Sequence, residues 1–534
     1  MFQILVADKI AETGVEFLRN QKEFEVIEAY GSTKEEILNI VPSVSAIVVR
    51  SETQIDADVI AAAPLLKAVG RAGVGVDNID LDAATERGIV VVNTPGGNTI
   101  ATAELTMTHL LCSSRPIAQA DRSMKQGNWD RKSLKGVELK DKTLAVLGLG
   151  RIGAEVAARA QAFGMTVIAY DPFLTEARAK AINVEKVDLD EVWARADYIT
   201  VHMPLTDKTR NMVNRDAFAK MKQGVRLVNC ARGGLIHEQD LIDAIESGKV
   251  SAAGLDVFEE EPLPADHPFR KCANLVLTPH LGASTEEAQY NVGIEIAEVI
   301  ARILKEGVIS NAVNVPSVDA HTLQQLRPYF RLGQILGTTV QQLTPDTIQR
   351  LQITYYGRLV ELDTMPLNRA IQKGYLLQIS GEEINDVNAG YYMKRLGIEG
   401  QITKSSSDTP YSELIQIEAI LEDGSSLSVE GTVMGRNLDP RIVSINGRDL
   451  EVTPRNVLML VENKDMPGMV GMLGTILGKH QVNIANMTLN RREAGQNALV
   501  VFELDQFPSD EAVAEITSSD RIVDLKLVDL TRIK

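Results

Sequence analysis

Short apolar runs alternate with segments of helical periodicity at the start of the chain. The apolar runs predict strands at 2–7, 25–29 and 46–49, and the amphipathic segments predict one helix ending at Arg19 and another over 34–40. Strands and helices that alternate in this way are typical of domains built on a parallel sheet. We therefore expect a small α/β domain at the N-terminus.

A second α/β pattern is organised around a glycine-rich turn. The apolar run 144–147 predicts a buried strand, and the helix-forming run 154–163 predicts a helix. Between them stands Gly148-Leu-Gly-Arg-Ile-Gly153, and a further strand, predicted at 166–170, ends in Asp171. This order of strand, glycine turn, helix and acidic strand end indicates a dinucleotide-binding domain.

Each glycine of this turn has a physical role in that interpretation. Gly148 permits a tight turn, Gly150 lets backbone N–H groups approach a pyrophosphate, and Gly153 lets the helix pack closely on the strand. The carboxylate of Asp171 follows about 20 residues later, where it can accept hydrogen bonds from a ribose 2′-OH and repel a 2′-phosphate. The glycines alone are a weak signal, but with the acid they predict NAD rather than NADP.

Three side chains suited to hydride-transfer chemistry follow the later strands. The predicted strands occupy 198–204, 225–230, 253–257 and 275–277. Beyond their ends stand Arg232, Glu261 and His280. An imidazole exchanges protons near neutral pH, a neighbouring carboxylate favours its protonated form, and a guanidinium holds a carboxylate with a planar fork. Oxidation of a hydroxy acid needs these three functions.

Each of the three residues also has an ordinary structural explanation. Glu261 belongs to a run of three glutamates that would suit a solvated surface, and Arg232 could be a surface cation. His280 could simply precede a helix, for which we predict a capping box made by Ser284 and Glu287. Because all three lie on strand-end loops after a dinucleotide-binding turn, we favour the catalytic interpretation.

Two arginines at strand ends of the N-terminal domain are candidates for binding an anion. Arg50 follows a predicted strand, and Arg71 opens a glycine loop that ends at Asn78. Ligands of open α/β sheets bind beyond the carboxyl ends of the strands. A surface ion pair explains Arg50 equally well, whereas the glycines around Arg71 favour an anion there.

Two segments between the α/β patterns lack clear chemistry. Residues 101–113 predict a helix that is apolar nearly all round, which must be buried either in the core or in a subunit interface. The basic stretch 129–135 is most simply a solvated loop.

Size and charge narrow the possible functions. A chain of 534 residues suggests three or four domains, and a net charge of −17 argues against nucleic acid or an anionic membrane as partner. The cysteines, Cys112, Cys230 and Cys272, have no paired spacing that would indicate disulfides or a metal site. The chain starts in a strand, without a leader or a long apolar segment, so we expect a cytoplasmic protein.

The regular alternation of predicted strands and helices ends near residue 316. Residues 317–453 mix a long helix, predicted at 322–343, with strands at 351–356, 413–421 and 427–432, which indicates an α+β domain. Residues 454–534 show the order βαββαβ, with Pro467-Gly468 opening the first helix.

Four stretches together carry a family resemblance. They are Gly70-Arg-Ala-Gly-Val-Gly-Val-Asp-Asn-Ile79, Asn229-Cys-Ala-Arg-Gly-Gly-Leu235, Asp256-Val-Phe-Glu-Glu-Glu-Pro262 and Thr278-Pro-His-Leu-Gly-Ala-Ser-Thr285. They resemble the D-isomer-specific 2-hydroxyacid dehydrogenases, in the long form that acts on a phosphorylated substrate. The resemblance covers nearly the whole chain. It implies NAD-dependent oxidation of 3-phospho-D-glycerate to 3-phosphohydroxypyruvate, the first step of L-serine synthesis.

The resemblance also implies roles for individual residues. Arg232, Glu261 and His280 match the family's substrate arginine, glutamate partner and acid–base histidine. With the glycines, the residues implied to contact NAD are Arg151, Ile152, Asp171, Met203, Cys230, Ala231, Asp256 and Ala283. Those implied to approach the substrate are Arg50, Arg71, Gly97, Asn98, Arg232 and His280. Some relatives have a threonine where this chain has Met203, so only a backbone contact to the cofactor would be kept there.

The resemblance implies a four-part architecture. A flavodoxin-like substrate-binding domain comprises 1–98 and 284–316, and a Rossmann-type NAD-binding domain, 99–283, is inserted into it. An intervening domain of the allosteric-substrate-binding type, 317–453, and a regulatory ACT domain, 454–534, follow. In the ACT domain, Asp465 and Asn483 match positions that hold an effector serine in relatives, although the module could instead serve only dimerisation.

Two other functions remain open from the sequence. The same three residues would serve a dehydrogenase of an unphosphorylated 2-hydroxy acid such as glycerate or lactate, and a protein that senses dinucleotides without turnover could keep the fold. The apolar helix and the terminal module predict a homo-oligomer, a dimer or a tetramer.

Overall fold

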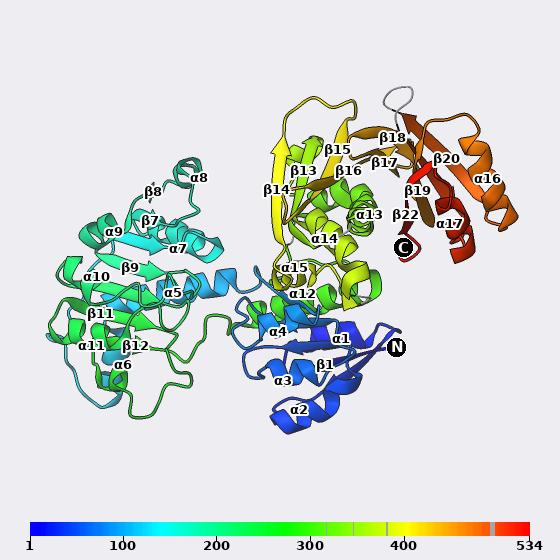
Figure 1. The fold of residues 1–534 in the computed structure, drawn as a ribbon. Coiled ribbons are helices and arrows are strands. Elements are labelled where there is room, and N and C mark those ends of the chain that lie inside the picture. The colour runs from blue at the N-terminus through cyan, green and yellow to red at the C-terminus, as the bar shows by residue number, and fades with distance from the viewer. Residues whose placement is uncertain (317, 345–346, 381–382, 492–496, 534) are drawn as a thin grey trace.

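Four β-sheets in chain order form the framework of the molecule (Figure 1). The computed structural model describes residues 1–316, 318–344, 347–380, 383–491 and 497–533. The expected start of the third domain at 317 and the end of the fourth at 534 fall outside the described residues.

The first sheet is parallel, with strand order β2-β1-β3-β4-β5, the flavodoxin-like arrangement. Its strands are β1 (Phe2–Val6), β2 (Phe24–Glu28), β3 (Ala46–Val49), β4 (Ala68–Arg71) and β5 (Val90–Asn93). Its helices are α1 (Glu12–Arg19), α2 (Lys34–Ile40), α3 (Ala57–Ala61), α4 (Leu81–Glu86) and, from much later in the chain, α12 (Glu286–Glu306). The predicted 34–40 helix and 46–49 strand are confirmed as α2 and β3.

Helix α12 belongs to this first core because its buried face packs against β4 and α1. Ile296 and Ile300 lie in one apolar cluster with Ile4 and Val6, and a side chain in place of Gly70 would strike Ile296. The chain therefore leaves this domain after β5 and returns to it about 190 residues later, from Asn93 to Glu286. This return explains how a second domain is inserted into the first.

The inserted sheet is parallel, and its order, β12-β11-β10-β9-β6-β7-β8, contains the Rossmann arrangement. Its strands are β6 (Thr143–Leu147), β7 (Thr166–Tyr170), β8 (Glu185–Lys186), β9 (Tyr198–Val201), β10 (Val225–Asn229), β11 (Val250–Leu255) and β12 (Leu275–Leu277). Its helices are α5 (Thr99–Ser114), α6 (Ile117–Lys125), α7 (Arg151–Ala162), α8 (Glu176–Ala181), α9 (Leu189–Arg195), α10 (Arg215–Lys220) and α11 (Glu238–Glu246). Helix α7 begins three residues before its predicted start, because Gly150, in an extended conformation, is its N-cap.

One local prediction was wrong. The Ser284–Glu287 capping box does not form, since the N-cap of α12 is Thr285, whose hydroxyl accepts the N–H of Ala288 at 3.1 Å. Helix α5 packs one face on α7, β10 and β11, while Ile100 and Leu111 on the other are 48% and 36% exposed in the single chain, so the core alone does not bury it. The 129–135 stretch forms no helix or strand, as expected of a loop.

The third sheet is mixed, with strand order β14-β13-β15-β16-β17-β18. Its strands are β13 (Ile348–Gly357), β14 (Glu399–Ser405), β15 (Glu413–Leu421), β16 (Ser426–Met434), β17 (Asp439–Ile445) and β18 (Arg448–Val452). Its helices are α13 (Ala320–Leu343), α14 (Met365–Ser380) and α15 (Ala389–Arg395). Helix α13 packs on β15, β16 and β17, and α14 packs on α13, which gives the predicted α+β fold.

The fourth sheet has the order β20-β21-β19-β22. Its elements are β19 (Val457–Lys464), α16 (Met469–Lys479), β20 (Ile484–Arg491), β21 (Asn497–Leu504), α17 (Asp510–Thr517) and β22 (Ile522–Asp529). The predicted βαββαβ order is confirmed. Within the described ranges of the whole chain, no helix is both long and apolar enough to cross a membrane.

Candidate active site

The glycine turn between β6 and α7 leaves room for a ligand at the start of the helix. Gly148 has a φ of 93°, and a Cβ there would lie 2.6 Å from the carbonyl oxygen of His202. A Cβ on Gly153 would collide with the carbonyl of Gly148, whereas a Cβ on Gly150 would meet no protein atom within 4 Å. Gly148 and Gly153 thus serve the packing of the turn, and the open space beside Gly150 fits a phosphate at the N-terminus of α7.

The carboxylate of Asp171 is held at the edge of this turn. One of its oxygens accepts the N–H of Leu149 at 2.9 Å, and the other accepts the N–H of Phe173 at 2.8 Å. Each carboxylate oxygen can accept a further bond. The structure therefore places a fixed negative charge beside the glycine turn, where a 2′-phosphate would be repelled.

The other residues implied to contact NAD surround the same edge of the sheet. Met203 follows β9, and its Cγ lies beside Gly148. Cys230 follows β10, where burial raises the pKa of its thiol to about 12, so the thiol is neutral. Arg151 donates to the carbonyl oxygen of Pro95 at 3.3 Å. Ile152 packs into the core beneath α7, and Ala231 and Ala283 lie half-buried in the loops after β10 and β12.

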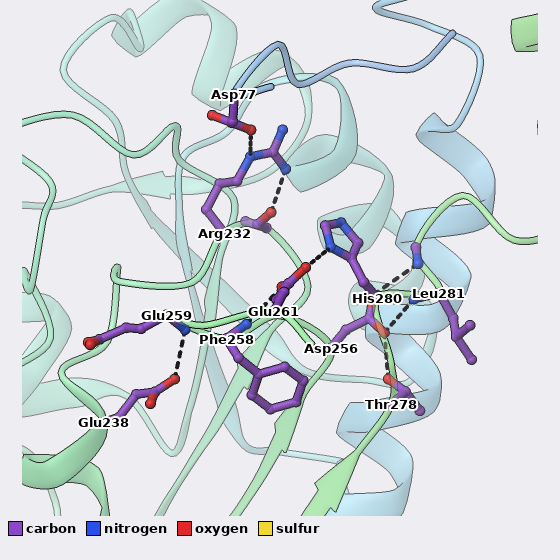
Figure 2. A network of polar contacts seen from close by, with 12 residues as sticks. Asp77, Arg232, Glu238, Asp256, Phe258, Glu259, Glu261, Thr278, His280 and Leu281 are labelled. Carbon is purple, nitrogen blue, oxygen red and sulfur yellow. Dashed lines mark hydrogen bonds and ion pairs between the residues drawn. The ribbon is translucent and has the colours of Figure 1, made fainter. Parts of the chain in front are cut away.

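His280 and Glu261 form a close pair (Figure 2). Nδ1 of His280 lies 2.7 Å from a carboxylate oxygen of Glu261, whose other oxygen accepts the N–H of Phe258 at 3.0 Å. Burial by itself would raise the pKa of Glu261, but hydrogen bonds from His280 and Phe258 and the charge of Arg232 hold it below its usual 4.5. Glu261 is therefore a carboxylate at neutral pH, and Nε2 of His280 has no partner within the described part of the chain.

The turn that carries His280 is held by a buried carboxylate. The backbone N–H of His280, at a φ of 54°, donates to the carbonyl of Asp256 at 2.9 Å. The fully buried side chain of Asp256 accepts the Thr278 hydroxyl at 2.6 Å and the N–H groups of Leu281 and Gly282 at 2.7 and 2.9 Å. Asp256, expected to contact NAD, thus also fixes the backbone from which His280 projects.

A buried histidine missed in the sequence supports the same turn. Nε2 of His109, on α5, lies 2.8 Å from the hydroxyl of Thr278. Burial lowers the pKa of His109, so its ring is neutral. The sequence signal for His109 was its position as a polar residue within a helix predicted to be apolar.

Arg232 is bound by an aspartate from the other domain. Its Nε donates to a carboxylate oxygen of Asp77 at 2.9 Å, and its Nη1 donates to the carbonyl of Ala231 at 2.6 Å. Asp77 lies in the loop after β4, so the pair links the two domains (Figure 2). Asp77 was not a candidate in the sequence, although it closes the glycine loop that Arg71 opens.

The glycine loop after β4 makes room for two guanidinium groups. A Cβ on Gly73 would collide with the guanidinium of Arg71, and one on Gly75 would collide with Nη2 of Arg232. Burial, followed by the charges of Arg232 and Arg50, lowers the pKa of Arg71 to about 10. Arg71 keeps its charge at neutral pH, and its buried Nε has no hydrogen-bond partner among the residues that the structure describes. The loop therefore gathers positive charge that an anionic ligand would relieve.

Arg50 is positioned by Asp8, a third residue missed in the sequence. The buried carboxylate of Asp8 accepts the backbone N–H of Arg50 at 2.7 Å and the N–H groups of Glu52 and Thr53. The Arg50 side chain makes only a 3.5 Å contact with the carbonyl of Lys9, which leaves its guanidinium largely available. The sequence did contain a signal for Asp8, because it is a carboxylate just after the first predicted strand.

Gly97 and Asn98 lie at the connection between the two domains, immediately before α5. A Cβ on Gly97 would collide with Val292 of α12, and the side-chain oxygen of Asn98 is buried without a hydrogen-bond partner in the described part of the chain. An unpartnered carbonyl oxygen beside the domain connection is compatible with the expected contact to a substrate.

The two expected effector residues lie in the fourth domain, Asp465 immediately after β19 and Asn483 immediately before β20. Asp465 accepts from Arg491 at 3.1 Å, and Asn483 donates to Asp505 at 2.5 Å. No hydrogen bond joins Asp465 to Asn483 in the ranges that the structure describes.

Known proteins share both the sequence and the fold of the chain. A model of the D-isomer specific 2-hydroxyacid dehydrogenase NAD binding domain matches residues 107–282, and one of the D-3-phosphoglycerate dehydrogenase intervening domain matches 325–446. The chain is 42% identical to D-3-phosphoglycerate dehydrogenases of Methanocaldococcus jannaschii and Archaeoglobus fulgidus, in each case over 99% of this chain and 100% of the relative. A solved D-lactate dehydrogenase of Aquifex aeolicus, in complex with NAD and lactic acid, matches 59% of this chain and 100% of its own at 28% identity and a TM-score of 0.54. The chain therefore belongs to the D-3-phosphoglycerate dehydrogenase family of D-isomer specific 2-hydroxyacid dehydrogenases.

Proposed function

We propose that this chain oxidises 3-phospho-D-glycerate to 3-phosphohydroxypyruvate with NAD, the first step of L-serine synthesis. The observation that carries the proposal is that side chains from two domains lie together at one site. The His280–Glu261 pair and Arg232 come from the NAD-binding domain, and Arg50 and Arg71 come from the other α/β domain. The charge of Arg232 acts on both Glu261 and Arg71, so the proton acceptor and the cation cluster belong to one site.

The residues divide the reaction between them. Arg232 holds the substrate carboxylate, and Arg50 and Arg71 attract the phosphate. Nε2 of His280 takes the hydroxyl proton as the carbon bearing that hydroxyl loses a hydride, and Glu261 stabilises the imidazolium that forms. The product carbonyl oxygen remains beside the protonated histidine, so the same groups serve the reverse reaction.

The residues of the inserted domain fit NAD. The open space beside Gly150 would receive the pyrophosphate, and the Asp171 carboxylate would receive the ribose hydroxyls. The sequence-predicted contacts from Arg151, Ile152, Met203, Cys230, Ala231, Asp256 and Ala283 remain part of this proposal. When bound, NAD supplies the hydride acceptor.

Initial rates of NADH formation at fixed NAD test the proposal, with 3-phospho-D-glycerate, D-glycerate and D-lactate compared side by side. A strong preference for the phosphorylated acid is expected because only that acid engages Arg50 and Arg71. Comparable rates without the phosphate would instead indicate a dehydrogenase of unphosphorylated hydroxy acids. Tight NADH binding without turnover of any acid would indicate a dinucleotide sensor.

We also propose that L-serine binds the fourth domain through Asp465 and Asn483. The support is the observed βαββαβ fold together with the two polar side chains, one just after its first strand and one just before its second. Calorimetry with L-serine, combined with assays at the same serine concentrations, tests this. No heat and unchanged activity would overturn it.

The remaining proposals concern the whole molecule. The exposed Ile100 and Leu111 of α5 support a homo-oligomer, a dimer or a tetramer, which light scattering after size exclusion would measure. We place the protein in the cytoplasm, without nucleic acid or membrane partners, which cell fractionation would test. We propose domain limits of 1–98 with 284–316, 99–283, 317–453 and 454–534, supported by the division of the strands into four sheets, and limited proteolysis would test them.

A further inference from the structure

We propose that Asp77 is a positioning residue: its carboxylate crosses from the substrate-binding domain to orient the Arg232 guanidinium when the two domains close. The inference rests on the proposed function of Arg232 as the group that holds the substrate carboxylate. Asp77 lies within one of the stretches that carry the family resemblance, but no role was assigned to it above.

The geometry leaves Arg232 able to hold a ligand while Asp77 holds Arg232. A guanidinium has five N–H donors. Asp77 accepts the one on Nε, and the carbonyl of Ala231 accepts one on Nη1. Within the described residues the remaining donors, on Nη1 and Nη2, have no hydrogen-bond partner, so they can bind a substrate carboxylate. Asp77 therefore restricts rotation of the guanidinium without competing for its outer nitrogens.

The pair forms only when the two domains approach each other. Asp77 follows β4 of the first sheet, and Arg232 follows β10 of the inserted sheet. The residues are 155 positions apart in the chain, and the carboxylate of Asp77 makes no other side-chain hydrogen bond in the described ranges. Replacing Asp77 should therefore leave the folding of both domains intact. The buried Asp8, by contrast, holds three backbone N–H groups.

The charges around the site explain why a carboxylate is needed there. Arg232, Arg71 and Arg50 come from the two domains to one place: burial first, and then the charges of Arg232 and Arg50, lower the pKa of Arg71. The negative charge of Asp77 acts on Arg71 in the opposite direction. Asp77 thus offsets the repulsion among three arginines before a substrate anion arrives.

The exposure of the pair suits a reversible contact. The side chain of Asp77 is 74% exposed and that of Arg232 is 28% exposed. Ion pairs this accessible to water are worth at most about 1 kcal/mol, which corresponds to about fivefold in an equilibrium constant. Such a contact orients Arg232 in the closed state but is too weak to keep the site closed after the product forms.

The test compares Asp77→Asn, Asp77→Ala and Asp77→Glu with the wild type, using the acid that the wild-type enzyme oxidises. We expect Asp77→Asn to raise the KM for the hydroxy acid about threefold to fivefold, with the KM for NAD and the melting temperature unchanged. Asp77→Ala should show at least the same effect, because it also removes the hydrogen bond, and Asp77→Glu should restore part of the affinity. In an Arg232→Gln background, Asp77→Asn should change the KM little further, because the effect acts through Arg232.

Asp58→Asn is the matched control. Asp58 is also an exposed aspartate of the first domain, 75% exposed and paired with Lys34 at 2.7 Å, but it lies on α3. It should leave every kinetic constant unchanged. The same rise in KM from Asp58→Asn would reduce the effect to net charge and overturn the proposal.

Other outcomes are equally decisive. A wild-type KM in Asp77→Asn would show that Asp77 does not act on Arg232, and a lower KM would show that it competes with the substrate carboxylate. Both results would overturn a positioning role. If the wild type oxidises only an unphosphorylated acid, the proposed function fails, but the ratio of KM values between variant and wild type still tests Asp77.

Discussion

The first two domains each have a glycine-rich turn, one after β4 and one after β6. The two turns differ in what fills the space that the missing Cβ atoms leave. Each follows the carboxyl end of a parallel strand, β4 in one domain and β6 in the other. After β4, Gly73 and Gly75 make room for the guanidinium groups of Arg71 and Arg232. After β6, Gly150 leaves space that no protein atom fills. A glycine in such a loop therefore indicates a missing Cβ, but only the fold shows whether protein or ligand takes its place.

The two domains also have different roles in the proposed reaction. The inserted domain carries the proton chemistry and the cofactor turn, whereas the first domain carries the cations that recognise the anion. Variants should therefore separate into those that change kcat and those that change the KM for one ligand.

The largest effect should come from the proton acceptor. His280→Gln removes the group that takes the hydroxyl proton, and general acid–base catalysis contributes about 10²- to 10⁴-fold. We expect a loss of kcat in that range, measured by initial rates at saturating substrate. NADH affinity, measured by fluorescence titration, should stay unchanged; a kcat close to that of the wild type would exclude His280 as the acid–base group.

The next effect should come from Gly75→Ala, which fills the space beside Arg232. The new Cβ would collide with Nη2 of Arg232 and displace the guanidinium. We expect a fall in kcat/KM for the hydroxy acid of at least about tenfold, because one lost charge-assisted hydrogen bond costs about 1.5–3 kcal/mol. The KM for NAD serves as the internal control and should not change.

Gly150→Ala is the converse variant in the other turn. Its Cβ meets no protein atom within 4 Å, and the residue has an ordinary φ of −73°, so folding should be unaffected. The methyl group instead enters the space proposed for the pyrophosphate. We expect about a tenfold rise in the KM for NAD, from the same loss of hydrogen bonding, with an unchanged KM for the hydroxy acid. Equal effects of Gly75→Ala and Gly150→Ala on both ligands would contradict the division between the turns.

A smaller and more selective effect is expected from Arg71→Gln. Arg71 is charged at neutral pH despite its lowered pKa of about 10, so it can attract a phosphate. The variant should raise the KM for the phosphorylated acid more than the KM for D-glycerate, by about tenfold for one lost charge-assisted contact. The ratio of the two KM values is the measurement, and an unchanged ratio would remove Arg71 from phosphate recognition.

The smallest effect concerns pH and Glu261. Because the pKa of Glu261 is lowered in the folded chain, its pairing stabilises the fold above the usual value of 4.5 and loses that contribution as pH falls through the lowered pKa. The side chain is 36% exposed, so solvent screening keeps the contribution below about 1 kcal/mol. The unfolding free energies of the wild type and Glu261→Gln, measured with denaturant, should differ at pH 7 and converge as the pH falls through the lowered pKa of Glu261. A difference that grows on acidification would contradict the sign.

Periodicity and short motifs were sufficient to predict most of the secondary structure. The α2 helix and the β3, β7, β12 and β15 strands coincide with their predicted ranges, and the order of the last domain is as predicted. Hydrophobic period and glycine spacing are local properties, and local properties decide where strands, helices and turns form. The same logic indicated Arg232, Glu261 and His280, because loops after parallel strands share one edge of the sheet.

Only the tertiary structure decided which of these loops lie together and which distant side chains hydrogen-bond to them. Asp77 reaches Arg232 from 155 residues away, and His109 reaches Thr278 from 169 residues away. Helix α5 has one face packed on α7, β10 and β11 and another face exposed, a division that its apolar composition did not reveal. A sequence pattern states the period of a segment and the chemistry of its side chains. Which partner each side chain finds depends on closing long loops between domains, which no local pattern records.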